Sequence, residues 1–247
     1  MESRRISSVK SDVQKLQHVR PVQPLVFGSM QPEWQLGQSL RHLHLCELLH
    51  ALLGQAVTRG DSVGCDQFVY FDASNPRRCV APDAFVKLGV PQRMFSSWKT
   101  WEHGAPEVCV EILSPSDEEP ITLAEKLERY RALGAKEVVV FNVDDPVTRL
   151  RVWDRIDDDL VERVIATSLP TPCTTLGMSW VVASAPDLPI ALRLSRDAEG
   201  TVLVLTPEES ERAAKESERA AKESERAAKE EALHELARLR AELAGSR

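Results

Sequence analysis

The sequence predicts a mixed α/β (α+β) fold in which a β-sheet is flanked by helices and followed by a long C-terminal helix. Two runs rich in β-branched residues, 80–88 (VAPDAFVKL) and 107–113 (EVCVEIL), indicate strands that each carry an acid. A helical segment follows, and then the apolar run 137–143 (EVVVFNV), so this strand–helix–strand unit favours a parallel pair. From residue 207 onward, a repeat rich in Ala, Glu, Lys and Arg predicts the long helix.

Length and composition indicate one globular domain with extensions. The chain has 247 residues, of which 43% are hydrophobic, enough to bury a core of its own. No apolar run approaches the roughly 20 residues that cross a bilayer, and the first residues lack a hydrophobic signal core. The five scattered cysteines form no C-x-x-C, so their spacing suggests neither a disulfide framework nor a zinc site. We expect a cytoplasmic protein without membrane association, in which most of the cysteines are small core residues.

The chain begins with a polar segment and a leucine-rich helix. Residues 1–30 predict a flexible arm, and 35–55 predict a helix with a broad leucine face that stops at Gly54. Within this helix, His42 and His44 are two residues apart and point to different sides, so they do not share a metal easily. We expect both histidines to serve in packing or at the rim of a site, while Glu47 is a candidate helix-borne acid.

The two predicted acidic strands would bring Asp83 and Glu111 together. An ionised acid inside a largely buried strand is costly unless it is compensated, and two neighbouring carboxylates also repel each other. A divalent cation resolves both problems, and Mg²⁺ suits a site with one or two carboxylates. The alternative is ordinary: Pro-Asp pairs occur in turns, and strand acids often face solvent.

A predicted helix over 116–133 adds a cation to this pair. Its apolar stripe contains Leu123, Leu127, Tyr130 and Leu133, and Gly134 provides a stop. Lys126 lies one position off the stripe, where its long stem can reach back toward the carboxylates. An ammonium there would stabilise the negative charge of a phosphorane or orient an attacking water.

The remaining segments supply further strands and one aromatic loop. Strands are expected within 57–72, in a hairpin over 149–166, and in 175–183 and 190–205. The loop 89–104 carries Trp98 and Trp101, which either stack on a base or sugar or cap the core. The second of these alternatives is the commoner.

These motifs resemble the Uma-type endonuclease family of the PD-(D/E)XK restriction-endonuclease-like superfamily. The matching residues are Pro82-Asp83, the run 111–116 (EILSPS), Lys126, Tyr130, Gly134 and Glu137, and the resemblance covers roughly residues 42–205.

The resemblance implies a metal-dependent endonuclease within 31–206 that hydrolyses nucleic acid, with DNA as the expected substrate. Asp83, Glu111 and the Ile112 main-chain carbonyl would hold Mg²⁺ or Mn²⁺. Lys126 would assist hydrolysis from the helix, because Leu113 occupies the usual lysine position. Accessory roles would fall to residues along the same motif and helix, namely His44, Glu47, Ser114 and Tyr130. The chain departs from the family at Thr122, where an acid is common.

The C-terminal segment 207–247 suggests a second class of function. The unit ESERAAK occurs three times in tandem from Glu209, with Glu and Lys four residues apart. Its seam would be Ser and Ala, so we expect a long exposed helix that forms at most a weak coiled coil. The alternative function is therefore a catalytically inactive nuclease-fold protein that recruits partners through this helix. Self-association would occur through the core or through this helix. The net charge of −7 argues against a general nucleic-acid coat protein.

Overall fold

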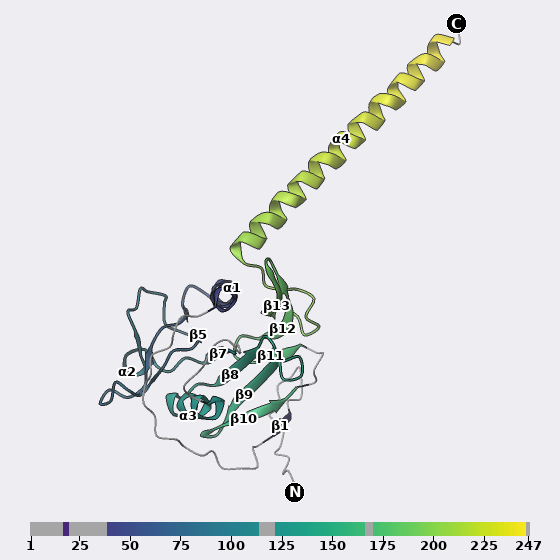
Figure 1. Ribbon diagram of the computed structural model, residues 1–247. Coiled ribbons are helices and arrows are strands. Elements are labelled where there is room, and N and C mark those ends of the chain that lie inside the picture. The colour runs from purple at the N-terminus through teal and green to yellow at the C-terminus, as the bar shows by residue number, and fades with distance from the viewer. Residues whose placement is uncertain (1–16, 20–38, 114–121, 166–169, 246–247) are drawn as a thin grey trace. The chain divides into compact units, whose positions relative to one another are not determined.

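A seven-stranded mixed sheet forms the centre of the first of two units in the computed structural model (Figure 1). The structure describes residues 17–19, 39–113, 122–165 and 170–245, and the chain divides into Met1–Val204 and Leu205–Arg247. In hydrogen-bonding order, the strands of the large sheet are β1 (Gln17–Val19), β10 (Asp159–Val164), β9 (Leu150–Ile156), β8 (Glu137–Asn142), β7 (Val108–Leu113), β5 (Ala84–Lys87) and β2 (Ser62–Gly64).

Within the described residues, two small sheets and three helices complete this unit. One small sheet contains β11 (Thr171–Cys173), β12 (Met178–Ala185) and β13 (Leu188–Ser195). The other contains β4 (Cys79–Val80), β3 (Val69–Tyr70) and β6 (Trp98–Lys99). The helices are α1 (Leu40–Ala56), α2 (Thr100–His103) and α3 (Leu123–Leu133). The predicted fold class is confirmed, including the parallel pairing of β7 with β8 on either side of α3 in the chain.

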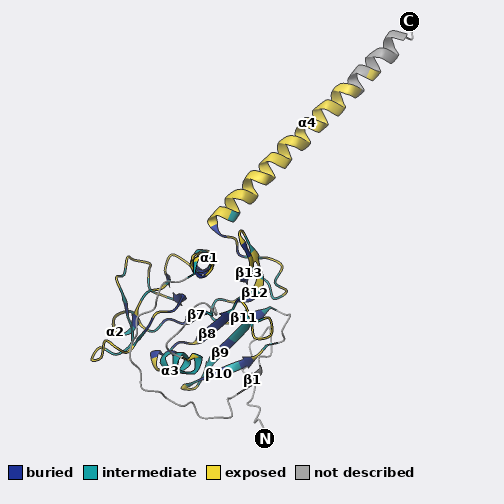
Figure 2. Ribbon diagram, viewed as in Figure 1, coloured by how far each residue is buried: buried dark blue, intermediate teal, exposed yellow. Residues whose placement is uncertain are grey.

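Strand alternation divides the interior into two cores on opposite faces of the large sheet. In β8, Val139 and Phe141 pack with α1 and the β11–β13 sheet, whereas Val138 and Val140 pack with α3. Successive strand residues point to opposite faces, so a fully buried strand is apolar throughout. Figure 2 accordingly shows the central strands as buried. The position of an acid along such a strand therefore decides which face of the sheet it lies on, and so which helix can supply partners for its buried charge.

A buried ionic network joins the β11–β13 sheet to the large sheet. Glu137 Oε1 accepts a hydrogen bond from Trp180 Nε1 (2.8 Å), and its Oε2 accepts one from the Thr174 amide (3.1 Å). Arg163 forms a two-pronged pair with Asp154, with its Nη2 3.9 Å from Glu137 Oε2. Burial raises the pKa of Glu137, and the Arg163 guanidinium opposes that shift. The network thus holds the β11–β13 sheet to the large sheet by hydrogen bonds and ion pairs as well as by apolar contact.

Several boundaries differ from the sequence expectation. The helix predicted over 35–55 continues past Gly54 to Ala56, because an exposed glycine near a helix end does not by itself stop the helix. The strand expected to contain Asp83 begins only at Ala84. Of the segment expected to be a flexible arm, Gln17–Val19 forms β1 and pairs with β10, while the rest of residues 1–30 lies outside the described residues.

The two tryptophans of segment 89–104 lie in different environments. Trp98 is fully buried, packs edge-on against Phe85 and Phe95, and donates a hydrogen bond from Nε1 to the Gly104 carbonyl (2.9 Å). This burial excludes Trp98 from stacking on a base. Trp101 is 49% exposed.

The second unit consists of α4 (Pro207–Gly245), a single long helix. Each repeat forms its expected i, i+4 ion pair: Glu211–Lys215, Glu218–Lys222 and Glu225–Lys229 have N–O distances of 2.5–2.6 Å. From Ser210 onward, the side chains described along these repeats are exposed (Figure 2), so the local pairs and high helix propensity support the helix. Among the described helices of the whole chain, none combines the length and apolar character that a membrane crossing requires.

The close approach of Phe85 to Gly64 provides a test of the β2–β5 contact. A Cβ on Gly64 would lie 2.1 Å from Phe85 Cε1. We expect Gly64→Ala to lower the free energy of unfolding by about 1–3 kcal/mol, because the buried ring must shift. The matched control is Gly54→Ala in α1, which meets nothing within 4 Å and should raise stability by up to about 1 kcal/mol. Urea denaturation of both variants measures this difference, and equal effects would contradict the packing argument.

Candidate active site

Asp83 lies at the junction of β5, β7 and α1. It directly precedes β5, which pairs antiparallel with β7 through Ala84 and Val110. Its Oδ2 accepts a hydrogen bond from the Ile112 amide at 2.6 Å. Its Oδ1 lies 2.9 Å from Nε2 of His42 on α1, which donates when that nitrogen carries the proton. Asp83 is only 6% exposed, and its carboxylate is held by contacts from two elements, α1 and β7.

Glu111 lies on β7 and faces α3. Alternation along β7 places it on the same face as Cys109, which belongs to the α3-side core. Lys126 Nζ donates to Glu111 Oε2 at 2.5 Å, and the Tyr130 hydroxyl donates to Oε1. Lys126 and Tyr130 are four residues apart and so lie on one face of α3. The predicted reach of Lys126 toward the acidic strand is thus seen in the structure.

The start and end of α3 are both fixed by local contacts. Thr122 is the N-cap and forms a capping box with Glu125, which satisfies main-chain donors at the helix start. Gly134 ends the helix with φ of 95°, a conformation that glycine adopts without a steric penalty. Thr122 thus caps the helix that carries Lys126, at the position where the resembling family commonly has an acid.

The pKa of Glu111 shows how this environment acts on its charge. Burial raises the pKa from 4.5 to about 7, and the neighbouring Asp83 adds to the rise. The Lys126 ammonium and the Tyr130 hydrogen bond oppose that shift. Burial and the Glu111 charge also raise the pKa of Tyr130. Its hydroxyl therefore stays protonated and acts as the hydrogen-bond donor to Glu111. The site therefore holds a carboxyl whose protonation changes near neutral pH in the absence of a cation.

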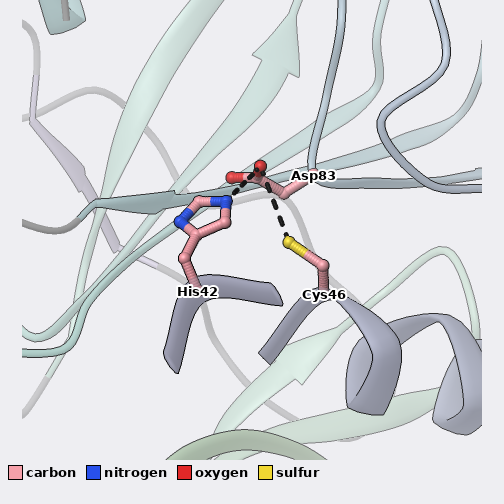
Figure 3. Close-up of side chains that lie close together, drawn as sticks. All are labelled: His42, Cys46 and Asp83. Atoms are coloured by element: carbon pink, nitrogen blue, oxygen red, sulfur yellow. Dashed lines mark hydrogen bonds and ion pairs between the residues drawn. The ribbon is translucent and has the colours of Figure 1, made fainter. Parts of the chain in front are cut away.

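Helix α1 supplies two side chains to Asp83, as Figure 3 shows. His42 and Cys46 are four residues apart, point in the same direction, and are both buried. The Cys46 sulfur lies 3.8 Å from Asp83 Oδ1. A hydrogen bond with Cys65 and burial raise the pKa of the Cys46 thiol, which keeps it protonated. The i, i+4 spacing of His42 and Cys46 is visible in the sequence. The sequence prediction considered His42 only as a pair with His44, so it did not include Cys46.

The structure places the other predicted residues at different distances from this centre. Ile112 reaches the site through its amide, which binds Asp83. His44 is half-buried on α1 and Glu47 is exposed there, and neither takes part in the described contacts of the two carboxylates. Ser114 lies outside the described residues.

The donor set fits a hard divalent cation. Two buried carboxylates provide the oxygen ligands that Mg²⁺ or Mn²⁺ prefers, and the Asp83 charge adds to the rise that burial causes in the pKa of Glu111. His42, Cys46 and Asp83 also form a group whose ligand atoms lie within 4.8 Å of one another. The site therefore has side chains of the kinds that bind metal ions on both the strand side and the helix side.

Comparisons with known proteins found a family model and a solved structure that are similar to this chain. A family model named Uma2 and described as "Putative restriction endonuclease" matches residues 33–190. A crystal structure titled as a "putative nuclease belonging to DUF820" from Anabaena variabilis aligns with a TM-score of 0.42 and 13% identity. The alignment covers 67% of this chain and 80% of that one. Among curated proteins the chain has no significant match.

The family match spans well over half of the chain and contains both carboxylates, His42, Lys126 and Tyr130. The chain belongs to the Uma2 restriction-endonuclease-like family.

Proposed function

We propose that this protein is a metal-dependent endonuclease that hydrolyses phosphodiester bonds of nucleic acid, with DNA as the expected substrate. One observation carries the proposal. Asp83 and Glu111 are brought together by the β5–β7 pairing, and Lys126 Nζ lies 2.5 Å from Glu111 Oε2. Two buried acids with a lysine beside them form a charge arrangement suited to a cation and a phosphate group.

In this proposal, Asp83 and Glu111 hold Mg²⁺ or Mn²⁺, with the Ile112 main-chain carbonyl as a further ligand. A bound divalent ion would supply an activated water and charge stabilisation at the phosphate. The chain's own contribution is orientation. His42 and the Ile112 amide fix the two oxygens of Asp83, while Tyr130 and Lys126 fix those of Glu111. Such supporting contacts keep ligands in a productive geometry.

Lys126 has the second role in the proposal. Its side chain is 12% exposed, so its ammonium can reach a bound phosphate while it stays anchored to Glu111. A fixed positive charge at that place stabilises the extra negative charge that develops on the phosphoryl oxygens. Because the capping box at Thr122 sets where α3 starts, it also sets the position of this ammonium along the site.

The competing function is a nuclease-fold protein without catalysis that binds partners through α4. The favouring observation is that α4 extends over 39 residues and that, from Ser210 onward, the described side chains of its repeats are exposed. Both functions are compatible with the same fold, so only the chemistry separates them.

The first test is plasmid nicking with Mg²⁺ or Mn²⁺. We expect wild type to nick supercoiled DNA, chelation to stop it, and Asp83→Asn, Glu111→Gln or Lys126→Met to lower the rate about 100-fold or more, because each removes charge from the site. The matched control is Glu102→Gln, which removes an exposed acid on α2 and should leave the rate unchanged. Rates that survive the three site substitutions would refute the assignment. Absence of both cleavage and metal-dependent stabilisation would favour the binding function.

Tyr130→Phe tests orientation separately from charge. The substitution removes only the hydroxyl that donates to Glu111 Oε1 in a fully buried contact. We expect the nicking rate to fall about 10-fold or more, with a higher Mg²⁺ concentration needed for half-maximal rate, since second-layer contacts to metal ligands have effects of this size. An unchanged metal requirement would show that Tyr130 does not position Glu111.

The raised pKa of Glu111 predicts a pH-dependent stability in metal-free protein. Between 4.5 and about 7 the folded state holds a proton that the unfolded state has lost, so stability falls as pH rises through this window and levels off above it. We expect wild type to lose about 1–3 kcal/mol relative to Glu111→Gln, which cannot titrate. Urea denaturation in a chelator at several pH values measures this difference. Parallel pH profiles for the two proteins would contradict it.

A further inference from the structure

Two cysteines that are far apart in the sequence meet beside the candidate active site. Cys46 lies on α1, and Cys65 lies in the loop between β2 and β3. The two sulfur atoms and a carboxylate oxygen of Asp66 all lie within 4.8 Å of one another. This trio is separate from the oxygens of Glu111, and two of its three donors are thiols rather than carboxylates.

The fold fixes this loop by main-chain contacts to β5 and to the residues just before it. Gly64 pairs with Phe85 across the β2–β5 ladder, and its missing side chain lets the backbone run directly over the Phe85 ring. The Asp66 amide then donates to the Pro82 carbonyl at 3.1 Å. Asp66 has φ of 49°, a left-handed conformation that Asp and Asn adopt more readily than most residues. Both ends of the Cys65–Asp66 segment are thereby fixed next to the residues that lead into β5.

We propose that Cys46, Cys65 and Asp66 form a binding site for a soft divalent ion, with Zn²⁺ as the expected occupant. Thiolates select zinc-like ions over Mg²⁺, which prefers oxygen ligands. In a tetrahedral site with Zn–S bonds of about 2.3 Å, two sulfurs lie about 3.8 Å apart, so ligand atoms within 4.8 Å need only small side-chain movements. On binding, both thiol protons leave to solvent, and water fills the fourth position.

Exposure favours this trio over the alternative set of His42, Cys46 and Asp83. Those three side chains are all buried, and Asp83 already belongs to the proposed magnesium site. By contrast, Cys65 is half-buried and Asp66 is exposed, so an ion can reach the trio from solvent. Cys46 is the shared residue, and its sulfur lies 3.8 Å from Asp83 Oδ1. An ion in the trio would therefore tie the β2–β3 loop to α1 beside the acidic site.

Cobalt binding to the full-length, metal-stripped protein tests the site. Co²⁺ replaces Zn²⁺ in thiolate sites and gives a sulfur-to-metal charge-transfer band, measured here with the thiols kept reduced by a non-chelating phosphine. We expect one equivalent of Co²⁺ to produce the band in the wild-type protein. Added Zn²⁺ should then remove the band, whereas added Mg²⁺ should not. Cys65→Ser should lose the band. Asp66→Asn tolerates the same backbone conformation and should weaken cobalt binding about 10-fold or more.

Two control variants show whether the band belongs to these three residues. Cys79→Ser alters another half-buried cysteine, on β4 and outside the trio, and should keep the band. Glu111→Gln disables the proposed magnesium site and should also keep it, so failure of the nuclease proposal would leave this result intact. A band that survives Cys65→Ser, or one that never forms in fully reduced wild-type protein, would overturn the proposal.

Discussion

The burial of two neighbouring carboxylates is the constraint on which the centre of this protein depends. Asp83 and Glu111 are only 6% and 4% exposed, and removing ionised acids from water costs several kcal/mol each unless partners compensate. The chain supplies a main-chain amide and His42 to one acid, and Lys126 and Tyr130 to the other. These partners offset burial only in part, since the pKa of Glu111 is still raised. The remaining unfavourable energy is what a bound cation would relieve.

The compensation comes from opposite faces of the sheet. His42 belongs to α1, which packs on one core, whereas Lys126 and Tyr130 belong to α3, which packs on the other. Because each helix is positioned by its own apolar contacts, both cores must be intact for the two acids to be held together. The site therefore depends on tertiary packing as much as on its own hydrogen bonds, and core substitutions far from the carboxylates would act on it through helix position.

Local patterns were enough to predict the strand–helix–strand unit and the approach of Lys126 to Glu111. Alternation in β7 and the stripe on α3 are properties of neighbouring residues, so they are visible without a structure. The meeting of Cys46 with Cys65 was not predictable in this way, because it depends on how the β2–β3 loop returns to α1. The burial of Trp98 was hidden for the same reason: its ring is enclosed by Phe85 from a different strand.

The two ligand classes around Asp83 bear on metal selection. Glu111 and Asp83 offer hard oxygen donors, while Cys46, only 3.8 Å from Asp83 Oδ1, offers sulfur. At a single mixed site, a zinc-like ion would outcompete magnesium, because affinity for nitrogen and sulfur ligands rises steeply toward the late transition metals. In the two proposals the donors are divided into an oxygen pair, Asp83 and Glu111, and a thiol pair, Cys46 and Cys65, so each ion would have its own ligands. Asp83 belongs to the oxygen pair and is in contact with Cys46 of the thiol pair, so an ion bound at either proposed site would change the electrostatic field at the other.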